Sequence, residues 1–315
     1  MSRPLFQVIK PGLLTTFQDL GRTGYQEYGV VVAGAMDDYS LQIANLLVGN
    51  QRNEAALEVT MMGPTLKVLK DTVISICGGN LSPRVNGIPV PMWKSIAVKE
   101  GQLIEFGQPL EGIRSYISVA GGFDLPVVMG SKSTFLKAKL GGMNGRALEK
   151  EDMLCGFEQA QSVAGRSLHY DAIPVYKKEV TVRVILGPHQ DAFTKEALDT
   201  FLSSAYEITP QSDRMGYRLN GPELKHKTSA DIISEAIPLG GIQVPANGQP
   251  IILMADRQTT GGYTRIATVI AADMPKLAQA APGSVVRFEA VSVDEAQALY
   301  LRKEKIVSVL EKIVM

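Results

Sequence analysis

The sequence predicts a mainly β protein with few helices, organised as two domains of the β-barrel or β-sandwich type. The chain has 315 residues, which exceeds the usual size of one domain. Short runs of β-branched residues recur along it, and 30 glycines and 17 prolines separate these runs as tight turns require. We assign residues 1–165 to the first domain and 166–315 to the second, because the stretch 157–178 carries little pattern. A weak echo of residues 57–67 in 217–225 favours two related domains.

The expected strands are apolar runs bounded by Gly, Pro, Asn or Asp. They are residues 72–77, 95–98, 103–106, 115–119, 180–186, 251–254, 266–270 and 285–288. Asn86-Gly87 predicts a hairpin, since both residues tolerate a positive φ. Because helical patterns do not alternate regularly with these runs, a barrel or sandwich is favoured over βαβ units.

Three segments carry helical spacing, namely 37–48, 191–202 and 292–314. Gly49 is placed to end the first helix. Ser292 and Glu295 form a capping-box pattern at the start of the last one. Asp37 and Asp273 both precede expected helices, so N-capping is a structural alternative to any binding role for them.

Composition excludes several classes of function. Lys plus Arg and Asp plus Glu both number 32, so the formal net charge is zero, which argues against nucleic acid and anionic lipid as partners. The first residues lack the apolar stretch of a signal peptide, and no window approaches the roughly 18 apolar residues of a membrane span. Cys77 and Cys155 are too few for a disulfide framework. We expect a cytoplasmic protein with reduced thiols.

Common cofactor motifs are missing from the sequence. It contains neither a Gly-x-x-x-x-Gly-Lys-Ser/Thr phosphate loop nor a Gly-x-Gly-x-x-Gly fingerprint, and no Gly-x-Ser-x-Gly elbow. The three histidines are scattered and the cysteines lack metal spacing, so we expect no metal site. Ala35-Met36-Asp37 lacks the lysine that a biotin carrier's Ala-Met-Lys-Met turn holds, so no biotin is expected on this chain.

Charged and amide side chains gather in Gly-rich clusters, as they do on the loops of a barrel rim. The clusters are residues 15–22, 34–37, 112–114, 130–134, 212–216 and 255–263. Asp19 with Arg22, and Asp213 with Arg214, have a structural alternative as salt bridges within turns. Glu235 lies in apolar, Gly-rich surroundings, where a carboxylate needs a partner or a ligand.

In order along nearly the whole chain, these motifs resemble the family known as the 5-oxoprolinase C subunit, KipI antagonist or allophanate hydrolase subunit 2. The resemblance is carried by residues 11–25 (PGLLTTFQDLGRTGY), 34–37 (GAMD), 130–134 (GSKST), 212–216 (SDRMG), 234–238 (SEAIP) and 256–263 (DRQTTGGY). Phe17 departs from the family, which often has Val there, and Cys77-Gly78-Gly79 stands where Gly-Ala is common. Neither departure affects the assignment.

The resemblance implies two tandem cyclophilin-like β-barrels. It also implies a bacterial enzyme that opens 5-oxoproline to glutamate with ATP hydrolysis. The expected partners are two further subunits of that enzyme, one KipI-like (B) and one LamB/YcsF-like (A), which would share ATP, with Mg²⁺, with this chain. A related module forms part of the carboxyltransferase region of urea carboxylase.

A flat amide substrate, whether a lactam or urea, presents an N–H to donate and a C=O to accept. Carboxylate or amide oxygens suit the first group, and arginines suit the second or a substrate carboxylate. We therefore expect Glu235, Asp256 and Arg214 to be catalytic, with all the polar loops converging on one cleft. The expected substrate-binding residues are Gln18, Arg22, Asp37, Arg114, Ser131, Gln243, Gln258 and Tyr263.

Two other functions remain open on the sequence. One is a biotin-dependent carboxyltransferase component acting on urea or a similar amide, with biotin supplied by a separate chain. The other is a non-catalytic regulator that binds a KipI-like kinase inhibitor. Turnover of 5-oxoproline with the partner subunits separates these functions from the first.

Overall fold

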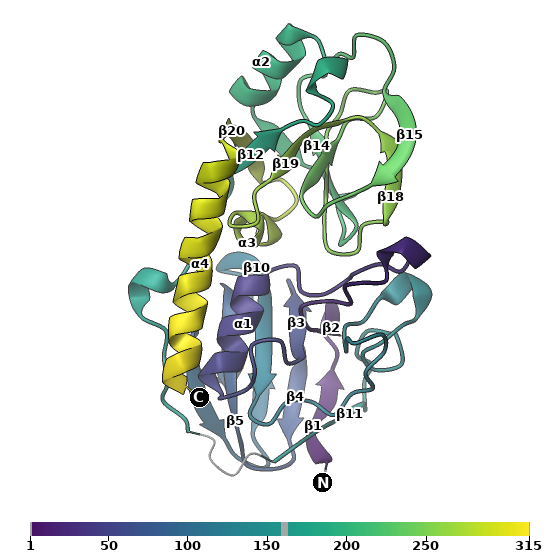
Figure 1. The fold of residues 1–315 in the computed structure, drawn as a ribbon. Helices are drawn as coiled ribbons and strands as arrows, with labels where there is room; N and C mark the ends of the chain where they lie inside the picture. The colour runs from purple at the N-terminus through teal and green to yellow at the C-terminus, as the bar shows by residue number, and fades with distance from the viewer. Residues whose placement is uncertain (1, 159–162, 315) are drawn as a thin grey trace. The chain divides into compact units, whose positions relative to one another are not determined.

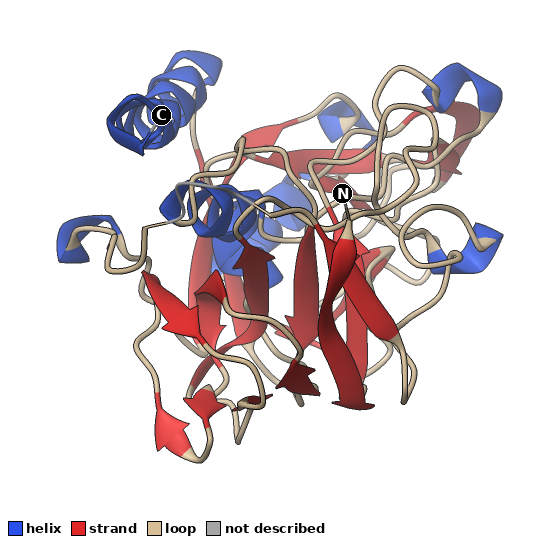
Figure 2. Cartoon of the chain, turned by 90° about the horizontal axis from the view of Figure 1, so that it is seen from below, coloured by secondary structure: helices blue, strands red, loops and turns tan. Residues whose placement is uncertain are grey.

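The chain is mainly β in a computed structural model that describes residues 2–158 and 163–314 (Figures 1 and 2). It divides into two compact units. Unit 1 comprises Met1–Thr23, Ala33–Val175 and Ile306–Met315, and unit 2 comprises Gly24–Val32 and Tyr176–Lys305. The sequence analysis placed one boundary between residues 165 and 166. It did not predict that a short segment near each end of the chain would join the other half.

Two sheets form unit 1. The first contains β1 (Arg3–Lys10), β4 (Thr65–Val68), β6 (Arg84–Val85), β7 (Ile88–Pro89), β9 (Leu103–Glu105) and β11 (Met153–Gly156), in the order β11-β1-β4-β9-β6-β7. The second contains β2 (Leu14–Gln18), β3 (Ala56–Thr60), β5 (Thr72–Asn80), β8 (Lys94–Val98) and β10 (Glu111–Val119), in the order β2-β3-β10-β5-β8. The predicted hairpin is confirmed, since Asn86 (φ 50°) and Gly87 (φ 76°) connect β6 to β7.

The second sheet of unit 1 is covered on both faces. Ile74 and Ile76 of β5 belong to the core that the two sheets share. Side chains alternate along a strand, so Cys77 and, on β10, Tyr116 belong to a second core on the opposite face. The helix α1 (Asp38–Leu47) packs over β5 and β10 on this face (Figure 1). Polar side chains of unit 1 that lie on this face are therefore buried under a helix.

Unit 2 contains the predicted closed barrel. Its strands are β12 (Glu179–Leu186), β13 (Tyr206–Ile208), β14 (Gly216–Asn220), β16 (Gly241–Gln243), β17 (Ile251–Leu253), β19 (Arg265–Val269) and β20 (Val285–Ala290), in the order β12-β19-β16-β17-β14-β13-β20. A separate two-stranded ribbon pairs β15 (Asp231–Ala236) with β18 (Thr260–Tyr263). The ribbon carries Glu235, one of the residues that the sequence predicts to be catalytic.

The helices follow their local capping signals. The last predicted helix is confirmed as α4 (Val293–Val314), where the backbone N–H of Ser292 donates to Glu295 Oε2 at 2.8 Å and that of Glu295 donates to Ser292 Oγ at 3.2 Å. The helix predicted over 191–202 is a 3₁₀ turn, η4 (Gln190–Ala192), followed by α2 (Lys195–Ser203). It starts later because Thr194 is the N-cap.

Asp37 caps α1 as predicted, through a hydrogen bond from the Ser40 N–H to its Oδ1 at 2.9 Å. The capping prediction for Asp273 is wrong. The helix α3 (Met274–Ala278) follows it, but the Asp273 side chain caps no N–H of this helix and instead accepts three hydrogen bonds from Arg183, one from its backbone N–H and two from its guanidinium. The short 3₁₀ helices η1 (Gln26–Tyr28), η2 (Leu136–Ala138) and η3 (Tyr170–Ala172) complete the structure. No helix in the described ranges combines the length and apolar character of a membrane span.

Candidate functional site

The β15–β18 ribbon brings four sequence-predicted residues of unit 2 into one neighbourhood. Glu235 of β15 pairs with Gly261 of β18. A Cβ on Gly261 would lie 2.7 Å from Gln243 Nε2 and 3.3 Å from Gln258 Nε2, so both amides converge on this glycine. Gln243 also donates to the carbonyl oxygen of Tyr263 at 3.5 Å. The glycine is needed here because any side chain would displace these amides.

Glu235 lies between two basic side chains. Its Oε1 is 3.4 Å from Arg265 Nη2, and its Oε2 is 3.6 Å from His189 Nε2. The backbone N–H of Arg265 donates to His189 Nδ1 at 3.0 Å. Because Nδ1 accepts this bond, the neutral imidazole carries its hydrogen on Nε2, facing Glu235. The expectation that Glu235 needs a partner is thus met inside the chain by two residues that the sequence analysis did not select.

A pocket of about 380 Å³ lies beside this group, within unit 2. It is lined by Gln26, Val32, Ala236, Ile237, Pro238, Arg257, Gln258, Thr259 and Arg265. Its polar groups are two guanidinium groups, two amides and a hydroxyl, while aliphatic side chains form the rest of the wall. A pocket of this kind can hold a small polar molecule with a compact aliphatic body, since sites for small molecules span roughly 300–1,000 Å³.

Arg257 is partly buried in this pocket. Its Nε donates to the carbonyl oxygen of Ile237 at 3.1 Å, and its Nη1 lies 3.5 Å from that of Met254. Burial lowers the pKa of the Arg257 guanidinium, because the charged form loses water contacts. The sequence analysis missed this residue although it lies inside the DRQTTGGY motif. The signal that could have identified Arg257 is its position between Asp256 and Gln258, which were both selected as site residues.

The predicted catalytic residues Arg214 and Asp256 bind each other. Nε of Arg214 donates to Asp256 Oδ2 at 3.0 Å and Nη2 to Oδ1 at 2.9 Å, with both side chains 8% exposed. The Asp256 N–H also donates to the Arg214 carbonyl oxygen at 2.8 Å. Neither residue is among those lining the pocket. Asp213 accepts from the N–H groups of Met215 and Gly216 within its own turn.

Three of the predicted residues in unit 1 gather around Asp19. The carboxylate of Asp19 accepts hydrogen bonds from the Ser131 hydroxyl at 2.7 Å and from the Lys132 N–H at 2.6 Å. Arg22, which is 1% exposed, donates to the carbonyl oxygen of Ser133 at 2.5 Å. Gln18 donates to the carbonyl oxygen of Thr134 at 3.1 Å. This group links loops distant in sequence, and its side chains are buried within unit 1.

The other two predicted residues in unit 1 belong to the face covered by α1. Besides capping α1, Asp37 donates its backbone N–H to the Tyr116 hydroxyl at 2.8 Å, and this hydroxyl donates to Glu58 at 2.7 Å. Burial and the nearby Glu58 and Asp37 carboxylates raise the pKa of Tyr116 well above its usual value. Arg114, 5% exposed, is paired with Thr60 across β10 and β3. These buried positions support the structural alternative for Asp37.

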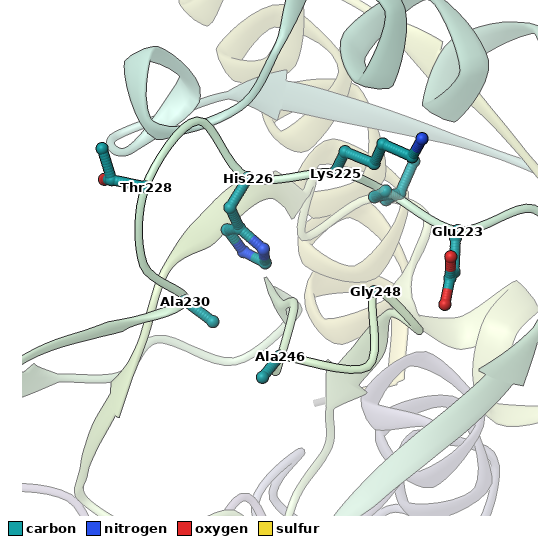
Figure 3. A pocket seen from close by; sticks show the side chains of 8 residues that line it. Glu223, Lys225, His226, Thr228, Ala230, Ala246 and Gly248 are labelled. Carbon is teal, nitrogen blue, oxygen red and sulfur yellow. The ribbon is translucent and has the colours of Figure 1, made fainter.

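A second pocket of unit 2, of about 310 Å³, is drawn in Figure 3. His226 points into it, with Ala230, Ala246 and Gly248 around the ring. Nε2 of His226 lies 2.9 Å from Thr264 Oγ1, and the ring lies 4.7 Å from that of Phe193. Burial lowers the pKa of His226, so the ring is neutral at pH 7. None of the sequence-predicted residues lines this pocket.

Within residues 2–158 and 163–314, no three His, Cys, Asp or Glu side chains are grouped closely enough to hold a metal ion.

Comparison with known proteins identifies the family that this chain matches. The family model described as carboxyltransferase domain, subdomain A and B, matches residues 28–290. The chain is 39% identical over 297 residues to the 5-oxoprolinase C subunit of Escherichia coli (strain K12), covering 93% of each chain. It is 38% identical over 299 residues to the protein of the same name from Haemophilus influenzae, covering 95% of each.

Among solved structures, Kluyveromyces lactis urea carboxylase is similar, with a TM-score of 0.93 and 31% identity over 99% of this chain. This chain spans only 30% of that longer one. The likeness therefore concerns one part of the urea enzyme, whereas it extends over nearly the full length of the two bacterial proteins.

Proposed function

The chain belongs to the carboxyltransferase-domain family that includes the 5-oxoprolinase C subunit, and from this we propose that it is a cytoplasmic subunit of an ATP-dependent 5-oxoprolinase. The observation that carries the proposal is the match to the Escherichia coli protein of that name, which covers 93% of both chains at 39% identity. A relative that matches over 93% of its own length at this identity is a stronger guide to activity than a module shared with a much longer enzyme.

The pocket beside Glu235 supports a lactam substrate. A lactam needs a hydrogen-bond donor or positive charge at its carbonyl oxygen and an acceptor at its N–H. Arg265 offers the first, and the amide oxygen of Gln258 offers the second. Glu235 is not among the residues that line the pocket, but its contacts with His189 and with Arg265, which does line it, support a role for Glu235 in proton exchange during ring opening. Glu235 and Gln258 therefore remain in the proposed site, with Gln243 and Tyr263 as their support.

Arg214 and Asp256 retain a proposed role only as supports of the loop in which the DRQTTGGY motif begins. For Gln18, Arg22, Asp37, Arg114 and Ser131, we propose that they shape unit 1 for its part in the complex. Their burial and their partners within unit 1 favour this over direct contact with a small molecule.

ATP is proposed as the second substrate, bound with Mg²⁺ mainly by the partner subunits, because this chain lacks a phosphate-loop sequence. When bound, ATP supplies the phosphoryl group that activates the lactam carbonyl for attack by water. The net reaction consumes one water to open the ring and one to hydrolyse ATP. The proposed partners are the KipI-like and the LamB/YcsF-like subunits.

The test is reconstitution. The chain is mixed with both partner subunits, 5-oxoproline and ATP, and glutamate and phosphate are measured. We expect glutamate only when all three proteins are present, and none when Glu235→Gln replaces the wild-type chain. Tight binding to the KipI-like partner without any glutamate would favour a regulator over an enzyme subunit.

A second candidate is a carboxyltransferase component that acts on urea or a related amide. The observation in its favour is the TM-score of 0.93 to urea carboxylase over 99% of this chain. This function requires carboxybiotin on another chain. Urea-dependent loss of the carboxyl group from a carboxylated biotin carrier, in the presence of this chain, would establish it.

A further inference from the structure

The guanidinium of Arg257, in the wall of the pocket, has no negative partner among the residues that the structure describes. Its two hydrogen bonds go to neutral carbonyl oxygens, those of Ile237 and Met254. In the described part of the chain, no carboxylate lies within 4.0 Å of it. Its Nη2 makes no hydrogen bond there. A partly buried charge without a counter-charge is costly, so the site gains stability when an anion enters.

Three other arginines of unit 2 that are buried or partly buried each have a carboxylate partner. Arg183 has both oxygens of Asp273, and Arg214 has both oxygens of Asp256. Arg265 has Glu235 at 3.4 Å. Arg257 differs from these three in lacking a carboxylate, although it lines a pocket together with one of them.

A second donor of the pocket is also unused. The Nε of Arg265 is buried and has no hydrogen-bond partner in the structure. Arg265 and Arg257 line the same pocket of about 380 Å³, together with the apolar side chains of Val32, Ile237 and Pro238. Two positively charged hydrogen-bond donors beside an aliphatic wall suit a small molecule that has a compact aliphatic body and a carboxylate.

We propose that Arg257 is a substrate-binding residue that recognises a carboxylate, so that the pocket selects flat amides bearing a carboxylate over neutral ones. The nature of the amide rests on the proposed function. The recognition of a carboxylate rests on the pocket alone. The specificity has a direct consequence, because urea has no carboxylate and would leave Arg257 without a partner, whereas 5-oxoproline supplies one.

The experiment uses the full chain and three probes, namely 5-oxoproline, 2-pyrrolidinone and urea, with binding measured by titration calorimetry. 2-Pyrrolidinone is the same lactam without the carboxylate. The wild-type chain is expected to bind 5-oxoproline at least about tenfold more tightly than 2-pyrrolidinone. Arg257→Gln is expected to remove that preference, because it should weaken the binding of 5-oxoproline and leave the affinity for 2-pyrrolidinone unchanged. Arg257→Lys should retain part of it.

Arg287→Gln is the matched control. It also removes an arginine of unit 2, from the exposed pair with Glu179 outside the pocket, and it should bind both lactams as the wild type does. Thermal unfolding of each variant shows that it is folded. Equal affinity of the wild type for the two lactams, or an unchanged preference in Arg257→Gln, would overturn the inference.

The outcome is independent of turnover. A carboxylate preference that disappears in Arg257→Gln, without any glutamate in the reconstituted assay, upholds the anion site and counts against the proposed function. Glutamate formation whose KM for 5-oxoproline is the same in Arg257→Gln and wild type supports the function and rejects the anion site.

Discussion

Arg214 and Asp256, 42 residues apart in the sequence, form a two-bond ion pair in which each side chain is only 8% exposed. Such a pair fixes two loops of unit 2 to each other, and both of its members are shielded from solvent. The arrangement predicts that its removal affects folding before it affects chemistry.

Asp256→Ala is expected to lower the free energy of unfolding by about 3–5 kcal/mol, because it leaves the Arg214 guanidinium buried and unpaired. Urea unfolding followed by fluorescence measures this. Glu179→Ala, which breaks the exposed pair with Arg287, is the control and should cost no more than about 1 kcal/mol. A stable Asp256→Ala protein that has lost turnover would instead restore the catalytic role expected from the sequence.

The contact between His189 and Glu235 leads to a second prediction, which concerns kcat. The side-chain amide of Asn reaches the position of the His Nδ1, whereas that of Gln reaches the position of Nε2. His189→Asn can therefore keep the bond from the Arg265 N–H but cannot contact Glu235. We expect kcat to fall about tenfold or more in His189→Asn, and clearly less in His189→Gln, as general acid–base groups contribute about 10²–10⁴.

The measurement is glutamate formation by the reconstituted complex across pH 5 to 9. His189 acts through Glu235, so its loss should also move the pH profile, which a purely structural residue would not do. The guanidinium of Arg265 also faces Glu235, and Arg265→Lys is included to separate its effect. Equal kcat and equal pH profiles in the Asn and Gln variants would show that Nε2 of His189 has no role.

Gly261 gives a prediction about packing. An added methyl group would lie 2.7 Å from Gln243 Nε2 and against the side chain of Ile237. Gly261→Ala is expected to cost about 1–3 kcal/mol of stability, as overpacked sites do, and to weaken binding in the neighbouring pocket. Thermal unfolding and the lactam titration measure the two effects.

Gly262→Ala is the matched neighbour on the same strand. Its added methyl would lie 3.2 Å from the Ile232 carbonyl oxygen and 3.4 Å from Ser234 Oγ, away from the amides. A smaller loss of stability with unchanged lactam binding is expected. If both glycine variants bind the lactam alike, the amides around Gly261 do not shape the pocket.

The sequence predicted most accurately those features that depend on residues close together in the chain. Asn86-Gly87 specifies its hairpin, and Ser292 with Glu295 specifies the start of α4, because each set of contacts spans four residues or fewer. The barrel of unit 2 follows from apolar runs of the right length. The order of the polar motifs along the chain carried the resemblance to a family.

The site was harder to predict because its chemistry depends on distant partners. Asp256 was expected to be catalytic from the sequence, yet each of its carboxylate oxygens accepts a hydrogen bond from Arg214. Nothing in the sequence sets Arg257 apart from the other arginines, and its lack of a carboxylate partner among the described residues becomes visible only in the folded chain. Asp273 illustrates the same limit, since a carboxylate before a helix usually caps it, while Arg183 competes for both oxygens here.

Asp273 also predicts how stability depends on pH. Burial works to raise the pKa of its carboxyl, but the hydrogen bonds from Arg183 and Lys276 outweigh burial and hold the pKa below its usual value. A carboxyl with a lowered pKa in the folded state stabilises the protein above its unfolded pKa, about 3.9. This stabilisation is lost as the pH falls through the lower, folded value. Asp273→Asn should thus be less stable than wild type at pH 7, and the difference should shrink below about pH 4.

Urea midpoints of wild type and Asp273→Asn between pH 7 and pH 3 measure that difference. Asp199→Asn, at an exposed carboxylate on α2 that forms no ion pair in the described chain, should differ little from wild type at any pH. The hydrogen bonds from Arg183 to Asp273, at 2.6 and 2.7 Å, are charge-assisted only while Asp273 is ionised. A stability gap that stays constant down to pH 3 would therefore mean that the shape of the Asp273 side chain, and not its charge, stabilises the junction of β12 and α3.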